Sequence, residues 1–263
     1  MAYYSGKSIL ITGASSGIGE ACAELLADQG AHLYLLARRE SELERVKSVC
    51  EARGAASVET FVCDVTDYQR VDQLIAQWTK DEVKLDGFIN NAGISQRALT
   101  FDVDFDVERK LMEVNFFAPI YLNKALYPLY NTNAHLIVIS SLSGLFGFPQ
   151  RSTYAASKHA LKGYFESLQV EHYPYHVSII CPGRIKTQIS VNAMLGDGSK
   201  HNEMDKAQEE GMPVEVCAQR ILHAAQKRQK LVLIGRKELL LYYIKKFIPP
   251  LFYKIASNIN ANG

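Results

Sequence analysis

The chain has 263 residues, of which 48% are hydrophobic and 22% are charged, and its formal net charge at pH 7 is +1. An α/β domain of this length buries a core without disulfides or metal, although two small domains also fit the length. A charge balance so close to neutral gives no reason to expect nucleic acid as a partner.

Short apolar runs alternate with amphipathic segments along the chain. Strands are expected at 8–12, 32–37, 57–63, 87–90, 135–140, 177–181 and 230–234. Helices are expected at 18–29, 41–53, 68–80, 105–130, 154–171 and 213–227. This alternation is typical of βαβ crossovers, and near-continuous apolar strands fit a parallel sheet covered on both faces. We therefore expect an α/β fold, a Rossmann-type doubly wound parallel sheet of about seven strands with helices on both faces.

No linker or break in composition divides the chain, so we expect residues 1–263 to form a single domain with its core at 6–235. Segment 188–211 is polar and contains glycines, and it follows a strand directly. A loop there would lie over the carboxyl edge of the sheet, where ligands bind in open α/β folds, so we expect it to contact the substrate. Residues 236–263 form a C-terminal extension.

A glycine-rich turn, Thr-Gly-Ala-Ser-Ser-Gly-Ile-Gly at 12–19, links the first expected strand to the first helix. Glycines let a ligand approach the backbone, and a helix N-terminus offers free N–H groups to a pyrophosphate. A plain tight turn is the alternative, but the position in a βαβ unit favours a dinucleotide. The candidate contacts are Gly13, Ser15, Ser16, Gly17, Ile18 and Gly19.

The TGxxxGIG spacing resembles the short-chain dehydrogenase/reductase family. Further residues carry the resemblance in family order: Asn90-Asn91-Ala92-Gly93, Asn115, Ser141, the Tyr-Ala-Ala-Ser-Lys motif from Tyr154 to Lys158, and Pro182-Gly183. They cover about residues 6 to 235. The resemblance implies a single dinucleotide-binding and catalytic domain whose enzyme interconverts a carbonyl and an alcohol with a nicotinamide cofactor.

The second expected strand ends in Arg38 and Arg39, where an acidic residue would bind the ribose hydroxyls of NAD. Arginine instead suits a 2′-phosphate, through a charge-assisted contact of roughly 1.5–3 kcal/mol. We therefore expect NADP(H) rather than NAD(H), with a solvated pair of arginines as the alternative. The resemblance places the phosphate contact at Arg38, and Ser15 is expected to add a hydroxyl.

The remaining cofactor contacts follow from the resemblance alone. It implies that Asp64 and Val65 flank the adenine, although Asp64 also suits a helix N-cap. It implies further contacts in the Asn-Asn-Ala-Gly motif and after the sixth strand, where the nicotinamide face and carboxamide would lie. Those residues are Asn91, Ala92, Gly93, Pro182, Gly183, Ile185 and Thr187.

Tyr154 and Lys158 are four residues apart, so they share one face of a helix. A nearby ammonium group favours the phenolate and lowers a tyrosine pKa from its usual value near 10, which makes a general acid/base. The resemblance implies that Lys158 also binds ribose and that Ser141 orients the substrate oxygen, with Ser140 as the adjacent alternative. It gives Asn115 a proton relay to Lys158, the alternative being a core amide bonded to backbone.

The expected substrate is a hydrophobic carbonyl or alcohol, lipid- or steroid-like. Its pocket wall would be the apolar segment 142–149, with Ile94 and loop 188–211. The tail at 236–256 mixes apolar residues with lysines, and Pro249-Pro250 breaks any helix there. It resembles the tails of hydroxysteroid-dehydrogenase-like and retinol-dehydrogenase-like branches. A peripheral membrane helix, a helix at a subunit interface and core packing all remain open for this tail.

The chain contains five cysteines without a CxxC pair, and its seven histidines show no metal-ligand spacing. We therefore expect free buried thiols and no metal. No apolar signal region begins the chain, and no stretch reaches the roughly 20 apolar residues of a membrane span, so a cytoplasmic enzyme is expected, with a membrane-peripheral one as the alternative. The resemblance implies a homodimer or homotetramer paired through the helices of Asn115 and Tyr154.

Two other functions stay open at this level. One is a 3-oxoacyl-thioester reductase of fatty-acid synthesis, which would tolerate truncation after about residue 235. The other is a catalytically silent NADP(H)-binding sensor, although all four catalytic positions are filled. Sugar epimerases share the Tyr-x-x-x-Lys pattern but generally carry a longer substrate region.

Overall fold

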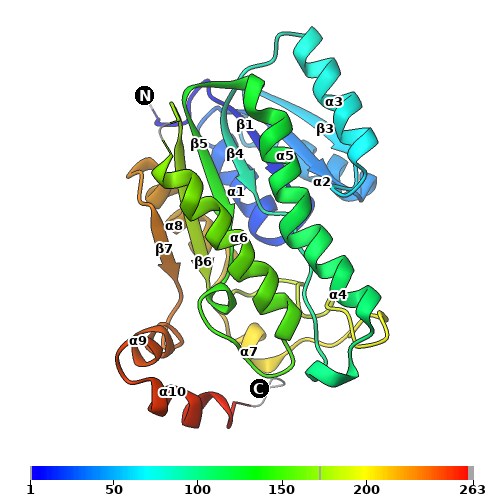
Figure 1. The fold of residues 1–263 in the computed structure, drawn as a ribbon. Helices are drawn as coiled ribbons and strands as arrows, with labels where there is room; N and C mark the ends of the chain where they lie inside the picture. Colours follow the sequence, from blue (N-terminus) through cyan, green and yellow to red (C-terminus); the bar gives the residue numbers. More distant parts are fainter. Residues whose placement is uncertain (1, 172, 260–263) are drawn as a thin grey trace.

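The computed structural model describes residues 2–171 and 173–259, and its frame is a parallel sheet of seven strands (Figure 1). The strands are β1 Ser8–Thr12, β2 His32–Ala37, β3 Ser57–Val62, β4 Leu85–Asn90, β5 Tyr130–Ile139, β6 His176–Pro182 and β7 Leu231–Ile234. Their spatial order is β3-β2-β1-β4-β5-β6-β7, and every neighbouring pair is parallel. The expected α/β class and parallel sheet are confirmed.

The order of the strands reverses at β1. The chain runs outward from β1 to β3, then crosses back so that β4 pairs with the other side of β1. Leu10 in β1 accordingly lies between Tyr34 of β2 and Phe88 of β4. A reversal of this kind opens a crevice at the carboxyl ends of β1 and β4, where ligands bind in such sheets.

Helices cover both faces of the sheet (Figure 1). On one face α1 packs against α2 and α8, and on the other α3, α4, α5 and α6 pack together. The helices are α1 Gly17–Ala27, α2 Glu40–Ala52, α3 Tyr68–Lys80, α4 Phe105–Met112, α5 Ala118–Leu126, α6 Ser152–Val170, α7 Lys206–Glu209, α8 Val214–Gln226, α9 Leu239–Phe247 and α10 Pro249–Ala256.

The core lies in two layers because side chains alternate across each strand. In β1, Ile9 and Ile11 join the apolar cluster beneath α1, α2 and α8, whereas Leu10 joins the cluster beneath the opposite helices. All three are at most 3% exposed. This two-sided burial explains why the strands read as continuous apolar runs.

The helix expected over 105–130 is divided in the structure. A π-helical turn, η2 at Glu113–Phe117, separates α4 from α5. A short 3-10 turn then leads into β5, which begins at Tyr130 rather than at the expected residue 135. The first four residues of β5 are partly or fully exposed and include polar side chains, so this part of the strand has no apolar signal.

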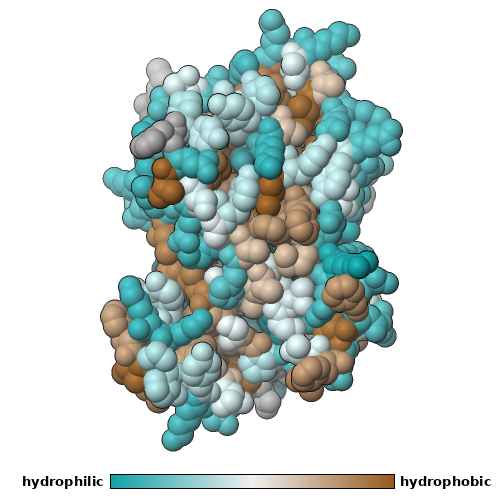
Figure 2. All heavy atoms as spheres, in the orientation of Figure 1, coloured by the Kyte–Doolittle hydropathy of each residue, from teal (hydrophilic) through white to brown (hydrophobic). Residues whose placement is uncertain are grey.

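The C-terminal extension forms two helices separated at Ile248, next to the predicted break at Pro249. Phe252 in α10 is 3% exposed and packs against Phe146, with ring centroids 5.4 Å apart. Leu240 and Phe247 of α9 are exposed, and brown spheres mark this end of the molecule at the lower left of Figure 2. Core packing therefore holds α10, while α9 keeps an exposed apolar side.

Candidate active site

A single cavity of about 510 Å³ lies at the carboxyl edge of the sheet and brings most of the predicted site residues together. Two of the predicted residues, Gly19 and Asn115, lie behind its wall. Those that line it are Gly13, Ser15, Ser16, Gly17, Ile18, Arg38, Arg39, Asp64, Val65, Asn91, Ala92, Gly93, Ser141, Tyr154, Lys158, Pro182, Gly183, Ile185 and Thr187. Residues from the first strand to the sixth thus meet in one space.

The glycine turn between β1 and α1 is held from β4. Asn91 donates from Nδ2 to the carbonyl oxygens of Thr12 and Gly13, at 3.0 and 3.2 Å. The Thr12 hydroxyl oxygen in turn accepts from the N–H groups of Asn91 and Ala92, each at 3.1 Å. A side chain on Gly19 would meet the Gly13 carbonyl at 2.5 Å, so Gly19 serves this close packing.

The turn presents the start of α1 to the cavity. Gly13 and Gly17 have φ angles of 65° and 61°, which favour glycine. The N-cap residue Ser16 makes no side-chain hydrogen bond to the helix, so the first N–H groups of α1 are left for a ligand. Thr187, from the segment after β6, lies against Gly17 and lines the cavity.

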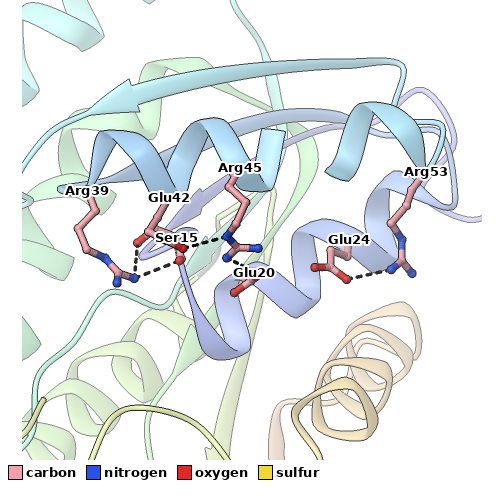
Figure 3. Close-up of polar contacts among 7 residues, drawn as sticks. All are labelled: Ser15, Glu20, Glu24, Arg39, Glu42, Arg45 and Arg53. Carbon is pink, nitrogen blue, oxygen red and sulfur yellow. Dashed lines mark hydrogen bonds and ion pairs between the residues drawn. The ribbon is translucent and has the colours of Figure 1, made fainter. Parts of the chain in front are cut away.

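The two arginines after β2 are held differently. Arg39 donates from Nη2 to the carbonyl and hydroxyl oxygens of Ser15, at 3.1 and 3.2 Å (Figure 3). Arg38 is 61% exposed and lies 3.5 Å from Asp64. Behind them, Arg45 of α2 and Arg53, directly after α2, pair with Glu20 and Glu24 of α1 and so link the two helices (Figure 3).

Asp64 does not cap α3. That cap is Asp67, whose side chain accepts from the N–H of Arg70, whereas Asp64 accepts from the N–H and hydroxyl of Thr66. Burial opposes ionisation of Asp64, but the hydrogen bonds from Thr66 and the charge of Arg38 outweigh it and lower its pKa. The N-cap alternative is therefore wrong, and the ionised carboxylate faces the cavity.

Tyr154 and Lys158 lie one turn apart on α6 and are 5% and 4% exposed. Lys158 donates from Nζ to the carbonyl oxygen of Ile139 at 3.0 Å. Burial lowers the pKa of Lys158 to about 8, so its ammonium form still predominates at neutral pH. The pair thus places a buried cation beside a phenol inside the cavity.

The two serines after β5 have different surroundings. Ser141 is partly exposed, lines the cavity and donates to the Pro182 carbonyl oxygen at 3.5 Å. The hydroxyl of Ser140 is committed to the carbonyl oxygen of Lys158 at 3.1 Å, and Ser140 is 3% exposed. This geometry favours Ser141 as the residue available to a substrate oxygen.

Asn115 is fully buried in the π-helical turn. Its amide donates to the Ile94 carbonyl at 2.9 Å and to the Ser157 hydroxyl at 3.1 Å, and its oxygen accepts from the Ile94 N–H at 2.9 Å. A side chain at Gly93 would lie 3.1 Å from Asn115 Oδ1 and 3.4 Å from Lys158 Nζ. Asn115 therefore joins the end of β4 to α6 directly behind Lys158.

The pocket wall contains the expected apolar residues and also charges that the sequence analysis missed. Ile94, Leu142, Phe148 and Pro149 line the cavity as expected, as does Ile189 from the loop. The charged lining residues that were not singled out are Arg97, Arg151, Arg184, Lys200, Asp205 and Glu238. Their partners are far apart along the chain, so no local pattern signalled them.

The described residues contain neither a metal-binding cluster nor a membrane-spanning helix. No group of three or more His, Cys, Asp or Glu side chains in this part of the chain is placed to hold a metal ion. Over the same residues, no helix has both the length and the apolar character needed to cross a membrane.

Several known proteins are similar to this chain in sequence or in fold. A family model described as short chain dehydrogenase matches residues 7–196. The Bos taurus protein named dehydrogenase/reductase SDR family member 7B is 38% identical over 269 residues, which cover 98% of this chain and 82% of that protein. Its Xenopus laevis counterpart is 36% identical over 266 residues, covering 97% and 82%. A short chain dehydrogenase/reductase from Burkholderia phymatum, solved in complex with NAD, has a TM-score of 0.83 at 23% identity and covers 95% of this chain and 96% of its own.

Proposed function

The chain belongs to the short-chain dehydrogenase family, and from its site we propose that it is an NADP(H)-dependent oxidoreductase. It interconverts a carbonyl and an alcohol on a hydrophobic, lipid- or steroid-like substrate. One observation carries the proposal. The glycine turn, the arginines after β2, Ser141, Tyr154 and Lys158 all line the same cavity. A nucleotide site and an acid/base pair therefore share one space.

The residues present fit a dinucleotide cofactor. The glycine turn brings backbone close to a ligand, and the uncapped start of α1 offers N–H groups and a positive dipole to phosphates. At the far end, Arg38 is the proposed contact for a 2′-phosphate, since its side chain is exposed and pairs with Asp64 alone among the described residues. The bound cofactor would supply or accept the hydride.

Tyr154 is the proposed general acid/base. In reduction its hydroxyl gives a proton to the substrate oxygen, and in oxidation it takes the proton back. The buried ammonium of Lys158, one turn along α6, places a positive charge beside the tyrosine hydroxyl that gives or takes this proton. Ser141 donates a hydrogen bond to the same substrate oxygen. Asn115 positions Ile94 and α6 and is proposed to support proton delivery to Lys158 from behind.

Replacing Tyr154→Phe tests the proposal because it removes only the titrating hydroxyl. We expect NADPH oxidation with hydrophobic ketones and aldehydes to fall by about a hundred- to ten-thousandfold. NADPH binding, followed by fluorescence, should persist. Tyr164→Phe on the same helix is the control, since Tyr164 is partly buried outside the cavity.

Three outcomes would redirect the proposal. Full turnover by Tyr154→Phe would remove tyrosine from the mechanism. Tight NADPH binding by the unmodified protein, with no turnover of any ketone, aldehyde or acyl thioester, would favour a cofactor-binding sensor. Turnover confined to acyl thioesters would favour the thioester reductase. That alternative expects activity to survive truncation after about residue 235, whereas Glu238 and Leu241 of the C-terminal segment line the cavity.

A further inference from the structure

A cluster of charged side chains lies in the cavity wall beside Tyr154 and has no part in the mechanism above. Arg97 follows β4, Arg151 directly precedes α6, and Asp205 directly precedes α7. Their side chains are 4%, 16% and 3% exposed. Arg97 Nε lies 3.3 Å from Asp205 Oδ1, and Arg97 Nη2 pairs with the other carboxylate oxygen. Arg151 Nη2 lies 3.8 Å from that same oxygen.

The cluster carries surplus positive charge. Two guanidinium groups face one carboxylate, and His201 Nε2 lies 3.7 Å from Asp205, where protonation would add a further positive charge. Burial and the charge of Arg151 lower the pKa of Arg97 to about 9, which leaves it charged at pH 7. Removing an unbalanced charge from water is unfavourable by several kcal/mol, so an anion bound against this cluster would be strongly stabilised.

Hydrogen-bonding capacity remains on both arginines. Among the described residues, Arg97 Nη1 is buried and has no hydrogen-bond partner. Arg151 uses Nη1 to donate to the Ser95 hydroxyl at 3.0 Å, and its contact with Asp205 is long. A guanidinium carries five N–H donors in a planar fork that matches an oxyanion, so both side chains have donors to offer.

The cluster lies close to the reacting centre. The Arg151 guanidinium sits over the ring of Tyr154, 5.4 Å from its centroid. Gln96, next to Arg97, accepts from the Tyr154 N–H at 3.3 Å. The amino end of α6 adds its positive dipole at the same place. A ligand oxyanion held by these groups would lie within a few bonds of a carbonyl at Tyr154.

We propose that the substrate is an apolar carbonyl compound that carries an oxyanion near its reacting carbon, bound by Arg151 with Arg97 behind it. This proposal rests on the proposed reductase function. Ile94, Leu142 and Phe148 contact the apolar part of the substrate. Asp205 orients Arg97 and neutralises one of the two positive charges, so that a single negative charge on the substrate balances the other.

Matched pairs of ketones test this charge preference. One pair is 4-oxo-4-phenylbutanoate and its methyl ester, and the other is phenacylphosphonate and its dimethyl ester. We expect kcat/KM with NADPH to favour an anion over its ester by tenfold or more, as one charge-assisted contact implies. The pair with the larger ratio identifies a carboxylate or a phosphonate as the preferred oxyanion.

Arg151→Met removes the charge and keeps much of the side-chain length. We expect it to bring the ratio of kcat/KM for the anion to kcat/KM for its ester to within about twofold of one. Only the anion loses a contact between opposite charges in this variant, because the ester is uncharged. Arg151→Lys should give an intermediate ratio, since the charge remains but the fork is lost. The control is Arg109→Met, which removes the same charge from the exposed side of α4.

Two results would overturn the proposal. One is an unmodified enzyme that prefers the esters or does not discriminate. The other is an Arg151→Met enzyme that loses activity on anions and esters equally, which would mean that the cluster only fastens the loop.

A binding measurement tests the proposed oxyanion site even if no ketone is reduced. Calorimetry of the NADPH-bound protein with 4-phenylbutanoate and 4-phenylbutanamide compares anion and neutral ligand without chemistry. We expect the acid to bind at least tenfold more tightly and Arg151→Met to remove the difference. Equal binding of acid and amide would reject the oxyanion site even in a working reductase.

Discussion

The two ends of the cavity each carry two arginines and one aspartate, in opposite surroundings. At the proposed cofactor end, Arg38, Arg39 and Asp64 lie near solvent, and the Arg38 and Asp64 side chains are 61% and 39% exposed. The proposed substrate end holds Arg97, Arg151 and Asp205, and the closest pair is only 4% and 3% exposed. Water screens the first set and not the second, so the same charges have different consequences for stability and binding.

The largest expected effect follows from breaking the buried set. Asp205→Ala leaves Arg97 charged and unpaired inside the protein, so we expect a loss of about 3–5 kcal/mol in the free energy of unfolding. Asp64→Ala removes a partner of Arg38 that water screens, and it should lower the free energy of unfolding by at most about 1 kcal/mol. Urea denaturation of the two cofactor-free variants measures both losses. Similar losses at the two positions would contradict the comparison.

Lys158, between the two ends, gives an intermediate effect that depends on pH. Burial lowers its pKa from 10.5 to about 8, so from pH 8 to 10.5 the unfolded chain binds more protons than the folded protein. The stability that Lys158 contributes is therefore fully present above pH 10.5, and it is lost as the pH falls from 10.5 to 8. We expect the total change to be roughly 3 kcal/mol.

Lys158→Met isolates this contribution. The stability difference between the unmodified protein and the variant, measured by urea denaturation at several pH values, should shift in favour of the unmodified protein as pH rises. Lys162→Met is the control, because Lys162 pairs with Glu166 near the surface of the same helix. A flat difference across the window would show that Lys158 is not desolvated.

The smallest expected effect lies at the exposed arginines. Arg38→Ala should lower the preference for NADPH over NADH, expressed as a ratio of kcat/KM, by about tenfold or more, corresponding to roughly 1.5 kcal/mol. Arg39→Ala should lower it less, because Arg39 is already committed to Ser15. A larger effect at Arg39 would transfer the phosphate contact to that residue. An unchanged ratio in both variants would remove the argument for NADP(H).

Local patterns predicted the parts of the site that depend on neighbouring residues. The glycine turn and the Tyr154–Lys158 pair are each encoded within a few positions, and both line the cavity. The Arg97–Asp205 pair forms because the loop after β6 brings Asp205 beside Arg97, and no local sequence pattern predicts that contact. The expected wall of segment 142–149, Ile94 and loop 188–211 was accordingly incomplete, because it lacked Arg97 and Arg151.

The fold shows the same division. Apolar runs predicted all seven strands, but the start of β5 was missed because its first residues are partly exposed and polar. The break beside Pro249 was predicted because a proline has no N–H for a helix interior and restricts the residue before it, here Ile248. The π-helical turn at Asn115 was not predicted, since its amide bonds to Ile94 and Ser157, which lie elsewhere in the chain.

The position of β1 in the sheet also orders events on the ribosome. If strands pair in the order in which they emerge, β1 pairs with β2, and β2 with β3, while the other edge of β1 waits for β4. Until Leu85–Asn90 has been synthesised, β1, an interior strand of the finished sheet, then has one open edge. Unpaired strand edges readily join other chains. We therefore expect this edge of β1 to be open to pairing with other chains during synthesis, until β4 covers it.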